Sequence, residues 1–307
     1  MTTKASAQSL GPSIPRPSAS LIVVNSHNEI LFVHRNPHAQ SFGGVYVFPG
    51  GNYDAKQDDS YRMTAIRETF EESGVLLASS QTRTQLSDAI LDASRESIHA
   101  QRLMFREFLR QHNLTADLDL FPFTEWVTPP PVPRRFHTRF YISFLPASSS
   151  PPSGFSQGTA QHRLPTPDGG LEVVAARFIH PLNALSEFRS SKITLMPPQY
   201  YLISTLAGIL HGRCTTPEQR ARVHELATGA FGRMVINPRA HSAGLDQDGR
   251  TVLTYEGDET RGGSKGRLHR SLVRFGRKGI PTEIVLLRNF DVFTEIESHA
   301  FSGQAKL

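Results

Sequence analysis

Short apolar runs separated by polar turns dominate the N-terminal part of the chain. Residues 21–24 and 30–33 are two such runs on either side of a turn-like Asn-Ser-His-Asn segment, and residues 45–48 form a third. Short apolar runs bounded by turn residues predict buried strands. We therefore expect two strands within residues 19–33 and a further strand just before the glycine pair at residues 50 and 51.

The apolar spacing changes to that of a helix over residues 61–73. Met63, Ile66 and Phe70 fall on one side of that helix, and Gly74 follows as a helix stop. We predict that this side faces the core and that the helix ends at the glycine.

Helical and strand-like patterns alternate through the rest of the chain. We predict helices within residues 76–113, 181–188, 200–210 and 217–228, and strands near residues 134–144, 171–178, 250–255, 268–275 and 283–287. Such interspersed elements favour a mixed α/β class. Two segments rich in Ser and Pro read differently: residues 1–18 as a flexible arm and residues 147–170 as a loop.

Three carboxylates lie on the opposite side of the 61–73 helix, because Glu71 and Glu72 follow Glu68 by three and four residues. Like charges at this spacing repel by roughly 0.2–0.5 kcal/mol per pair. A hard divalent cation such as Mg²⁺ relieves the repulsion, and carboxylates are its preferred ligands. Arg67 can pair with and orient a carboxylate. A bare acidic face is more often only solvated, so the pattern alone leaves both interpretations open.

Composition limits the class of protein without naming a substrate. The chain has 307 residues with 38% hydrophobic and 20% charged residues, which is typical of a soluble globular enzyme with one large domain or two small ones. We expect no membrane partner, because no run of 18 apolar residues occurs. Cys214 is the only cysteine, which is consistent with a reducing compartment. The net charge of +5 suits anionic substrates.

The acidic segment resembles the Nudix box, G-x5-E-x7-R-E-U-x-E-E-x-G-U, in which U is apolar. The residues that match it are Gly51, Arg67, Glu68, Glu71, Glu72, Gly74 and Val75. Three departures occur. The gap before Arg67 is two residues longer than in the pattern, and Thr69 replaces an apolar residue. The first glutamate is absent, with Gln57 in its place counting forward from Gly51 and Asp59 counting back from Arg67.

The resemblance implies a fold and a chemistry. The fold is the Nudix α/β/α sandwich with a mixed sheet, expected over residues 19–300, with a helical insertion at about 76–115 that either covers the active site or only stabilises the domain. Nudix enzymes hydrolyse a nucleoside diphosphate linked to another group, by attack of a metal-activated water on phosphorus.

The same resemblance implies the site residues. Glu68, Glu71 and Glu72, with Arg67, form the catalytic set, and the three glutamates would hold Mg²⁺ or Mn²⁺ ions with the Gly51 carbonyl as an extra ligand. We name Glu172, at the start of a late strand, as a further candidate carboxylate. The alternative for Glu172 is an edge-strand glutamate that faces water.

Substrate choice depends on a weaker match. Coenzyme A diphosphatases of this family carry L-L-T-x-R-[SA]-x3-R-x3-G-x3-F-P-G-G, of which Arg35, Gly44 and residues 48–51 match, while Asn36 and Gln40 depart. The wider layout is similar to the peroxisomal (acyl-)coenzyme A diphosphatase branch. This implies cleavage of coenzyme A or acyl-coenzyme A to 3′,5′-ADP and (acyl-)4′-phosphopantetheine. Arg35 would contact a substrate phosphate, or else is a surface arginine.

Two alternatives stay open: a Nudix hydrolase of another diphosphate (a nucleoside sugar, a dinucleotide or an isoprenoid diphosphate), and a non-catalytic module that binds a nucleotide or RNA. Residues 261–278 hold seven Lys or Arg, which we interpret as a solvated basic face, so no nucleic acid partner is expected.

The tail at residues 301–307 ends in Ala305-Lys306-Leu307, similar to a peroxisomal address read by an import receptor. A cytoplasmic location is the alternative.

Overall fold

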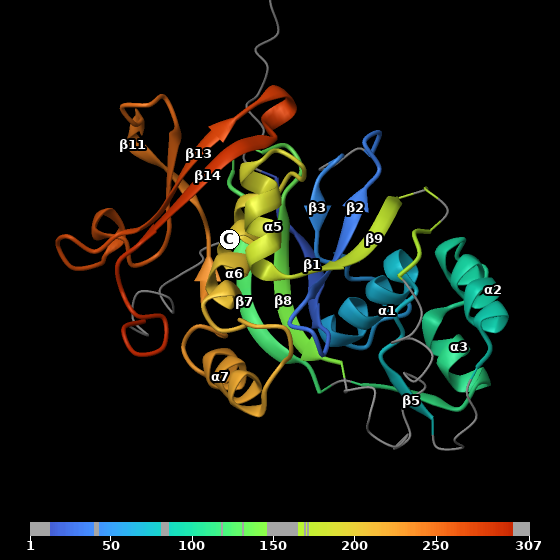
Figure 1. Ribbon diagram of the computed structural model, residues 1–307. Helices are drawn as coiled ribbons and strands as arrows, with labels where there is room; N and C mark the ends of the chain where they lie inside the picture. Colours follow the sequence, from blue (N-terminus) through green and yellow to red (C-terminus); the bar gives the residue numbers. More distant parts are fainter. Residues whose placement is uncertain are drawn as a thin grey trace, which may run out of the picture.

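A mixed sheet of eight strands forms the centre of the molecule (Figure 1). The computed structural model describes residues 13–39, 43–80, 86–117, 119–130, 132–145, 165–168, 170 and 172–296. The main path of the sheet is β10 (Val235–Ile236), β7 (Phe121–Val127), β8 (Phe136–Phe144), β1 (Arg16–Val24), β2 (Ile30–Arg35) and β3 (Tyr46–Val47). Two further strands pair off this path: β4 (Gly50–Asn52) with β1, and β9 (Val173–Ile179) with β2.

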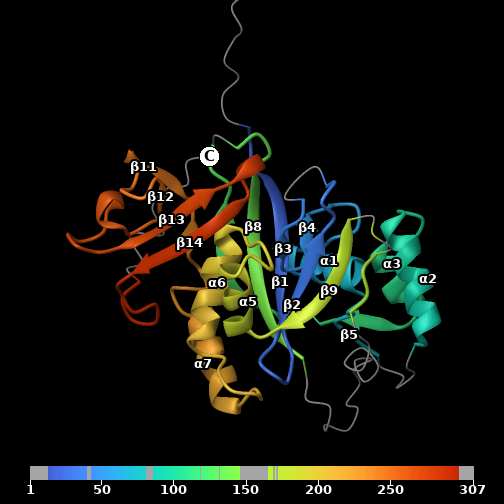
Figure 2. The same ribbon diagram turned by 45° about the horizontal axis from the view of Figure 1, so that its top comes forward.

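Helices cover both faces of this sheet (Figures 1 and 2). On one face lie α1 (Tyr61–Ser73), α2 (Asp88–His99) and α3 (Phe105–Gln111); on the other lie α5 (Pro181–Arg189), α6 (Pro197–Ala207) and α7 (Pro217–Thr228). Because β1 is buried on both sides, its apolar residues run consecutively instead of alternating. The predicted α/β/α arrangement with a mixed sheet is confirmed.

The insertion after α1 is only partly helical. It contains α2 and α3, but it begins with β5 (Ala78–Ser80) and ends with β6 (Leu114–Ala116), which pair with each other as antiparallel strands. We predicted continuous helical character here because the apolar spacing of α2 and α3 masked these three-residue strands. The pair brings the two ends of the insertion together next to α1.

The N-terminal boundary also differs from the sequence prediction. β1 begins at Arg16, inside the stretch that we predicted as a flexible arm, and residues 16–24 run parallel to β8. Ser18 is buried and its hydroxyl lies 2.8 Å from that of Thr138. The polar composition suggested disorder, but the backbone pairs with a neighbouring strand. The C-terminal tripeptide and most of the 147–170 loop lie outside the described residues.

A second sheet of four antiparallel strands lies beside α6, on the opposite side of the molecule from α2 and α3 (Figures 1 and 2). It comprises β11 (Arg239–Leu245), β12 (Thr251–Thr254), β13 (His269–Phe275) and β14 (Pro281–Arg288), with short 3₁₀ turns at Glu259–Arg261 and Arg277–Gly279. β12, β13 and β14 fulfil the strand predictions, whereas β11 was missed.

None of the described helices has the length and hydrophobicity needed to cross a membrane.

A buried histidine joins this second sheet to α6. The His269 Nδ1 atom lies 2.6 Å from the carbonyl oxygen of Glu256, and its Nε2 atom lies 2.8 Å from the Tyr201 hydroxyl. A carbonyl can only accept, so Nδ1 carries the proton and Nε2 accepts from the tyrosine. Burial lowers the pKa of His269 to about 3.

Stability should therefore fall on mild acidification. The folded-state pKa of His269 lies below its unfolded value, so its contribution is complete above about pH 6.5 and is lost as the pH falls. Between about pH 7 and pH 5 we expect a loss of about 2 kcal/mol from this group. Urea unfolding of the wild-type chain and His269→Gln at both pH values measures it: the variant should be less stable at neutral pH but should lack this part of the pH dependence. His211→Gln, at an exposed histidine, is the control, and an unchanged pH dependence in His269→Gln would contradict the assignment.

Candidate active site

The acidic face of α1 is turned inward. Ser60 caps the start of the helix by accepting from the Met63 N–H, and Gly74 ends it with a φ of 73°, as predicted. Ile66 and Phe70 are fully buried on the predicted core side. On the other side Glu72 is also buried, which excludes the simple solvated face that the sequence left open.

Glycine at position 51 leaves room for the Glu68 carboxylate. A β-carbon there would lie 2.5 Å from that carboxylate and would displace it from its present place. The glycine of β4 therefore lets the backbone approach this carboxylate directly. The structure thus brings together Gly51 and Glu68, as the motif predicted.

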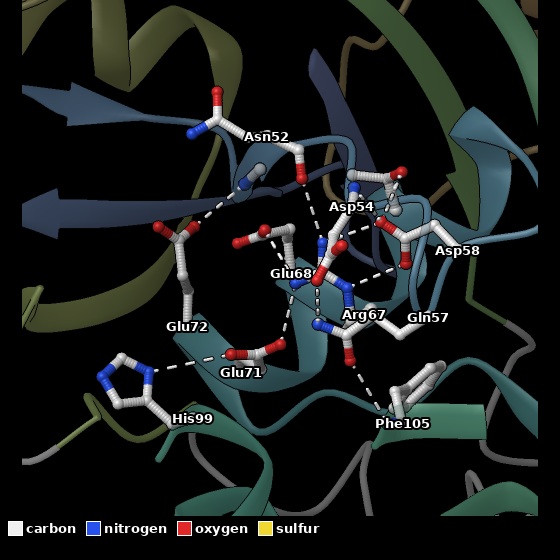
Figure 3. A network of polar contacts seen from close by, with 12 residues as sticks. Asn52, Asp54, Gln57, Asp58, Arg67, Glu68, Glu71, Glu72, His99 and Phe105 are labelled. Carbon is white, nitrogen blue, oxygen red and sulfur yellow. Dashed lines mark hydrogen bonds and ion pairs between the residues drawn. The ribbon is translucent and has the colours of Figure 1, made fainter. Parts of the chain in front are cut away.

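Arg67 is the centre of the polar network in Figure 3. Its Nε and Nη2 atoms each donate to Asp58 over 2.9 Å, and its Nη1 atom donates to Glu68 over 2.8 Å and to Glu71 over 2.9 Å. The Asp58 side chain is completely buried, and Thr64 donates to the same carboxylate over 2.9 Å. Burial alone would lower the pKa of Arg67, but these carboxylates raise it.

Asp58, which the sequence analysis missed, is the acid of the loop before α1 that pairs with Arg67. Counting from either end of the longer loop selected Gln57 or Asp59, the residues on either side of Asp58. Gln57 instead bonds to Asp54 and to the Phe105 N–H, and Asp59 is 67% exposed beside Arg106. With two extra residues in the loop, the acid in the middle is the one that reaches the arginine.

Glu72 is held by groups outside its own helix. Its Oε2 atom accepts from the Gly50 N–H over 2.9 Å, and its Oε1 atom forms an ion pair with Arg35 at 3.6 Å. Among the described residues, Oε1 accepts no hydrogen bond although it is buried. Arg35, predicted to contact a substrate phosphate, thus lies at the edge of the acidic cluster, and its role toward substrate stays a prediction.

Burial makes the carboxylates costly to charge. It raises the pKa of Glu68 to about 7, against the opposing effect of Arg67. It also raises the pKa of Glu72 well above its usual value, with a further contribution from the charge of Glu68. Glu172, an exposed residue just before β9, is near enough for its charge to raise both pKa values. Its place beside the cluster is therefore observed, whereas its role as a ligand stays a prediction.

Two residues of the insertion also reach α1, and the sequence analysis identified neither. Arg95 of α2 donates through Nε to the Glu71 carbonyl oxygen over 2.7 Å. His99, one turn later, places Nδ1 at 3.8 Å from the Glu71 Oε2 atom (Figure 3). Only the tertiary fold brings α2 to this end of α1, so no local pattern pointed to these two residues.

The residues present fit a hard divalent cation by their chemistry. All side-chain donors of the cluster are carboxylate oxygens. Glu72 is buried, the side chains of Glu68 and Glu71 are 14% and 12% exposed, and one oxygen of Glu72 lacks a hydrogen bond from the described residues. No three acidic, histidine or cysteine side chains within the described ranges are already gathered at coordination spacing. Glu68 and Glu71 are both paired with Arg67.

Three of the seven basic residues at 261–278 form ion pairs with carboxylates of the same region. Arg270 binds Asp258 through two hydrogen bonds of 2.7 Å, Arg274 pairs with Glu283, and Arg261 pairs with Glu256. The prediction of a solvated basic face is wrong for Arg261 and Arg270, whose side chains are 13% and 14% exposed against carboxylates of the fold. Arg274 is exposed, as predicted.

Removing the buried acid should be costly for stability. Asp58→Asn removes the carboxylate that pairs with the buried Arg67 charge. Because breaking a buried ion pair costs about 3–5 kcal/mol, the free energy of unfolding should fall by that amount. The exposed neighbour is a matched control: Asp59→Asn should change stability by less than about 0.5 kcal/mol. Urea unfolding followed by the fluorescence of Trp126, the single tryptophan, measures both. Equal effects of the two variants would contradict the role assigned to Asp58.

The sequence of the chain matches known proteins over its central part. The family profile described as the NUDT19 Nudix domain matches residues 55–206, roughly half of the chain. Acyl-coenzyme A diphosphatase NUDT19 of Homo sapiens is 31% identical over 171 residues, covering 50% of this chain and 40% of that protein. Its Xenopus laevis namesake is 29% identical over 161 residues, covering 47% of this chain and 38% of that protein. The chain thus spans less than half the length of these two relatives.

The fold matches as well. A NUDIX hydrolase from Alicyclobacillus acidocaldarius superimposes with a TM-score of 0.51 at 23% identity, covering 65% of this chain and 94% of that one. At this identity the likeness shows the fold alone. The domain match, the fold and the acidic helix opposite its glycine lead to one conclusion: the chain belongs to the Nudix hydrolase family.

Proposed function

We propose that this chain is a metal-dependent diphosphatase that cleaves coenzyme A or an acyl-coenzyme A to 3′,5′-ADP and (acyl-)4′-phosphopantetheine. The observation that carries the proposal is the packing of Glu68 and Glu72 in a buried cluster against the Gly50-Gly51 backbone. A binding module has no need of several buried carboxylates that repel one another. Their burial is costly unless a cation offsets it.

Glu68, Glu71 and Glu72 are the residues that would hold Mg²⁺ or Mn²⁺, with the Gly51 carbonyl and Glu172 as further oxygen donors. When bound, such an ion neutralises the diphosphate, polarises its P–O bonds and lowers the pKa of the attacking water. The chain supplies the remaining functions. Asp58 fixes Arg67, and Arg67 in turn fixes the carboxylates of Glu68 and Glu71 before substrate arrives.

A carboxylate oxygen can accept the proton of the attacking water. Glu71 is our candidate for this base because Arg67 engages only its Oε1 atom, and Oε2 points to the side where His99 lies. Glu172 is the second carboxylate that the fold brings to the cluster, and its charge acts on Glu68 and Glu72.

Two observations favour coenzyme A as the substrate. The relatives that match this chain include acyl-coenzyme A diphosphatases. Arg35, the first arginine of the coenzyme A pattern, lies 3.6 Å from Glu72, so a phosphate bound to the cluster would be within its reach. We therefore place the diphosphate between Arg35 and the acidic face of α1.

Loss of a carboxylate should remove metal-stimulated turnover. Because a metal contributes several kcal/mol to transition-state stabilisation, kcat of Glu71→Gln and Glu72→Gln should fall roughly 100-fold or more. Glu96→Gln, an exposed glutamate of α2, is the control and should retain full activity. Release of 3′,5′-ADP from coenzyme A, with and without Mn²⁺, is the measurement. Full activity of both site variants would rule out this assignment of the metal ligands.

A substrate panel tests the choice of coenzyme A. At matched concentrations of Mn²⁺, we expect coenzyme A or an acyl-coenzyme A to have the highest kcat/KM among coenzyme A, acetyl-coenzyme A, ADP-ribose, NADH and farnesyl diphosphate. Product analysis should detect phosphopantetheine and 3′,5′-ADP. Efficient hydrolysis of one of the other three, with none of coenzyme A, would replace the substrate while keeping the diphosphatase.

A further inference from the structure

We propose that α2 of the insertion is part of the active site, and that His99 is a positioning residue that holds the Glu71 carboxylate. The inference deepens the proposed function, since its kinetic consequences depend on that function. Its geometry depends only on the contacts between α2 and the C-terminal end of α1.

The end of α1 needs partners from elsewhere in the chain. The last four carbonyls of a helix have no partner within it. Gly74 donates back to the Phe70 carbonyl over 2.9 Å, and Thr166 donates to that of Ser73 over 3.1 Å. The Glu71 carbonyl oxygen accepts a hydrogen bond of 2.7 Å from the Arg95 Nε atom.

Arg95 therefore acts as a C-terminal cap for α1. It is buried, and its Nη1 atom donates to the Thr166 hydroxyl over 2.9 Å, so one guanidinium joins α2, α1 and the segment before β9. A cation at this end of a helix is also favoured by the helix dipole. α2 is thereby fixed in register against the turn of α1 that carries Glu71.

His99 lies four residues after Arg95 and so shares its face of α2. The Glu71 carboxylate is then bracketed: Arg67 donates to Oε1 over 2.9 Å, and His99 Nδ1 lies 3.8 Å from Oε2 (Figure 3). A separation of 3.8 Å is too long for a hydrogen bond. A small rotation of the carboxylate away from Arg67 would close it.

This bracket gives His99 a task that Arg67 cannot perform. Arg67 holds Glu68 and Glu71 through one nitrogen, Nη1, and contacts only the Oε1 atom of Glu71. A donor on the His99 side would fix the second oxygen of the Glu71 carboxylate and so set its rotation. Packing of α2 is served by other residues: Leu91 and Ile98 are buried, while the His99 side chain is 22% exposed.

The test compares His99→Ala with His99→Asn, whose amide nitrogen stands close to the position of Nδ1. Removing a group that orients a metal ligand usually costs about 10–100-fold in metal affinity or activity. We expect His99→Ala to bind Mn²⁺ about 10-fold more weakly, measured by electron paramagnetic resonance of free Mn²⁺, and to lose kcat by a similar factor with KM for coenzyme A nearly unchanged. His99→Asn should recover most of both losses, and His211→Ala, at an exposed histidine, should match the wild type.

The outcomes separate the two proposals. Weaker Mn²⁺ binding in His99→Ala with recovery in His99→Asn supports the positioning role, even if the wild-type chain hydrolyses no diphosphate and the proposed function fails. Unchanged Mn²⁺ affinity and kcat in a folded His99→Ala overturns the positioning role and leaves the proposed function intact. Equal losses in the Ala and Asn variants also overturn it, since a donor at the Nδ1 position would then be irrelevant.

Discussion

The buried ion pair between Arg67 and Asp58 is the constraint on which the site depends. Both side chains are almost completely removed from water, so each would be strongly destabilising without the other. Their two parallel hydrogen bonds tie the loop before α1 to the middle of that helix. The third nitrogen of the guanidinium is left to hold Glu68 and Glu71. A structural pair thus sets the position of the groups that carry the chemistry.

The acidic cluster is assembled from four separate parts of the chain. β4 supplies the Gly50 N–H and the bare backbone of Gly51, α1 supplies the glutamates, β2 ends at Arg35, and the segment before β9 contributes Glu172. β1 joins two of these parts, since β4 pairs with residues 18–20 of β1 and β2 pairs with its residue 24, while β8 occupies the other edge of β1. The site is therefore a product of the sheet register and not of the helix alone.

Local patterns in the sequence predicted most of the elements and the acidic helix. The boundaries of α1 and α7 and the stop at Gly74 follow from spacing and capping, which act over a few residues. Asp58 was missed because two extra residues in its loop shift the count, and only folding shows which acid reaches Arg67. Arg95 and His99 were missed because their partners lie more than a turn of helix away in sequence. The ion pairs of Arg261 and Arg270 in the second sheet were missed for the same reason.

The second sheet limits where the chain can be cut without exposing its core. Tyr255 of this region packs edge-on against Trp126 and Tyr201, with ring centroids 5.4 and 5.8 Å apart. The profile match ends at residue 206 and begins at residue 55, after β1, β2 and β4. A fragment cut at those limits would lose the middle of its sheet and lay open an aromatic cluster. We therefore do not expect residues 55–206, which the family profile matches, to fold on their own.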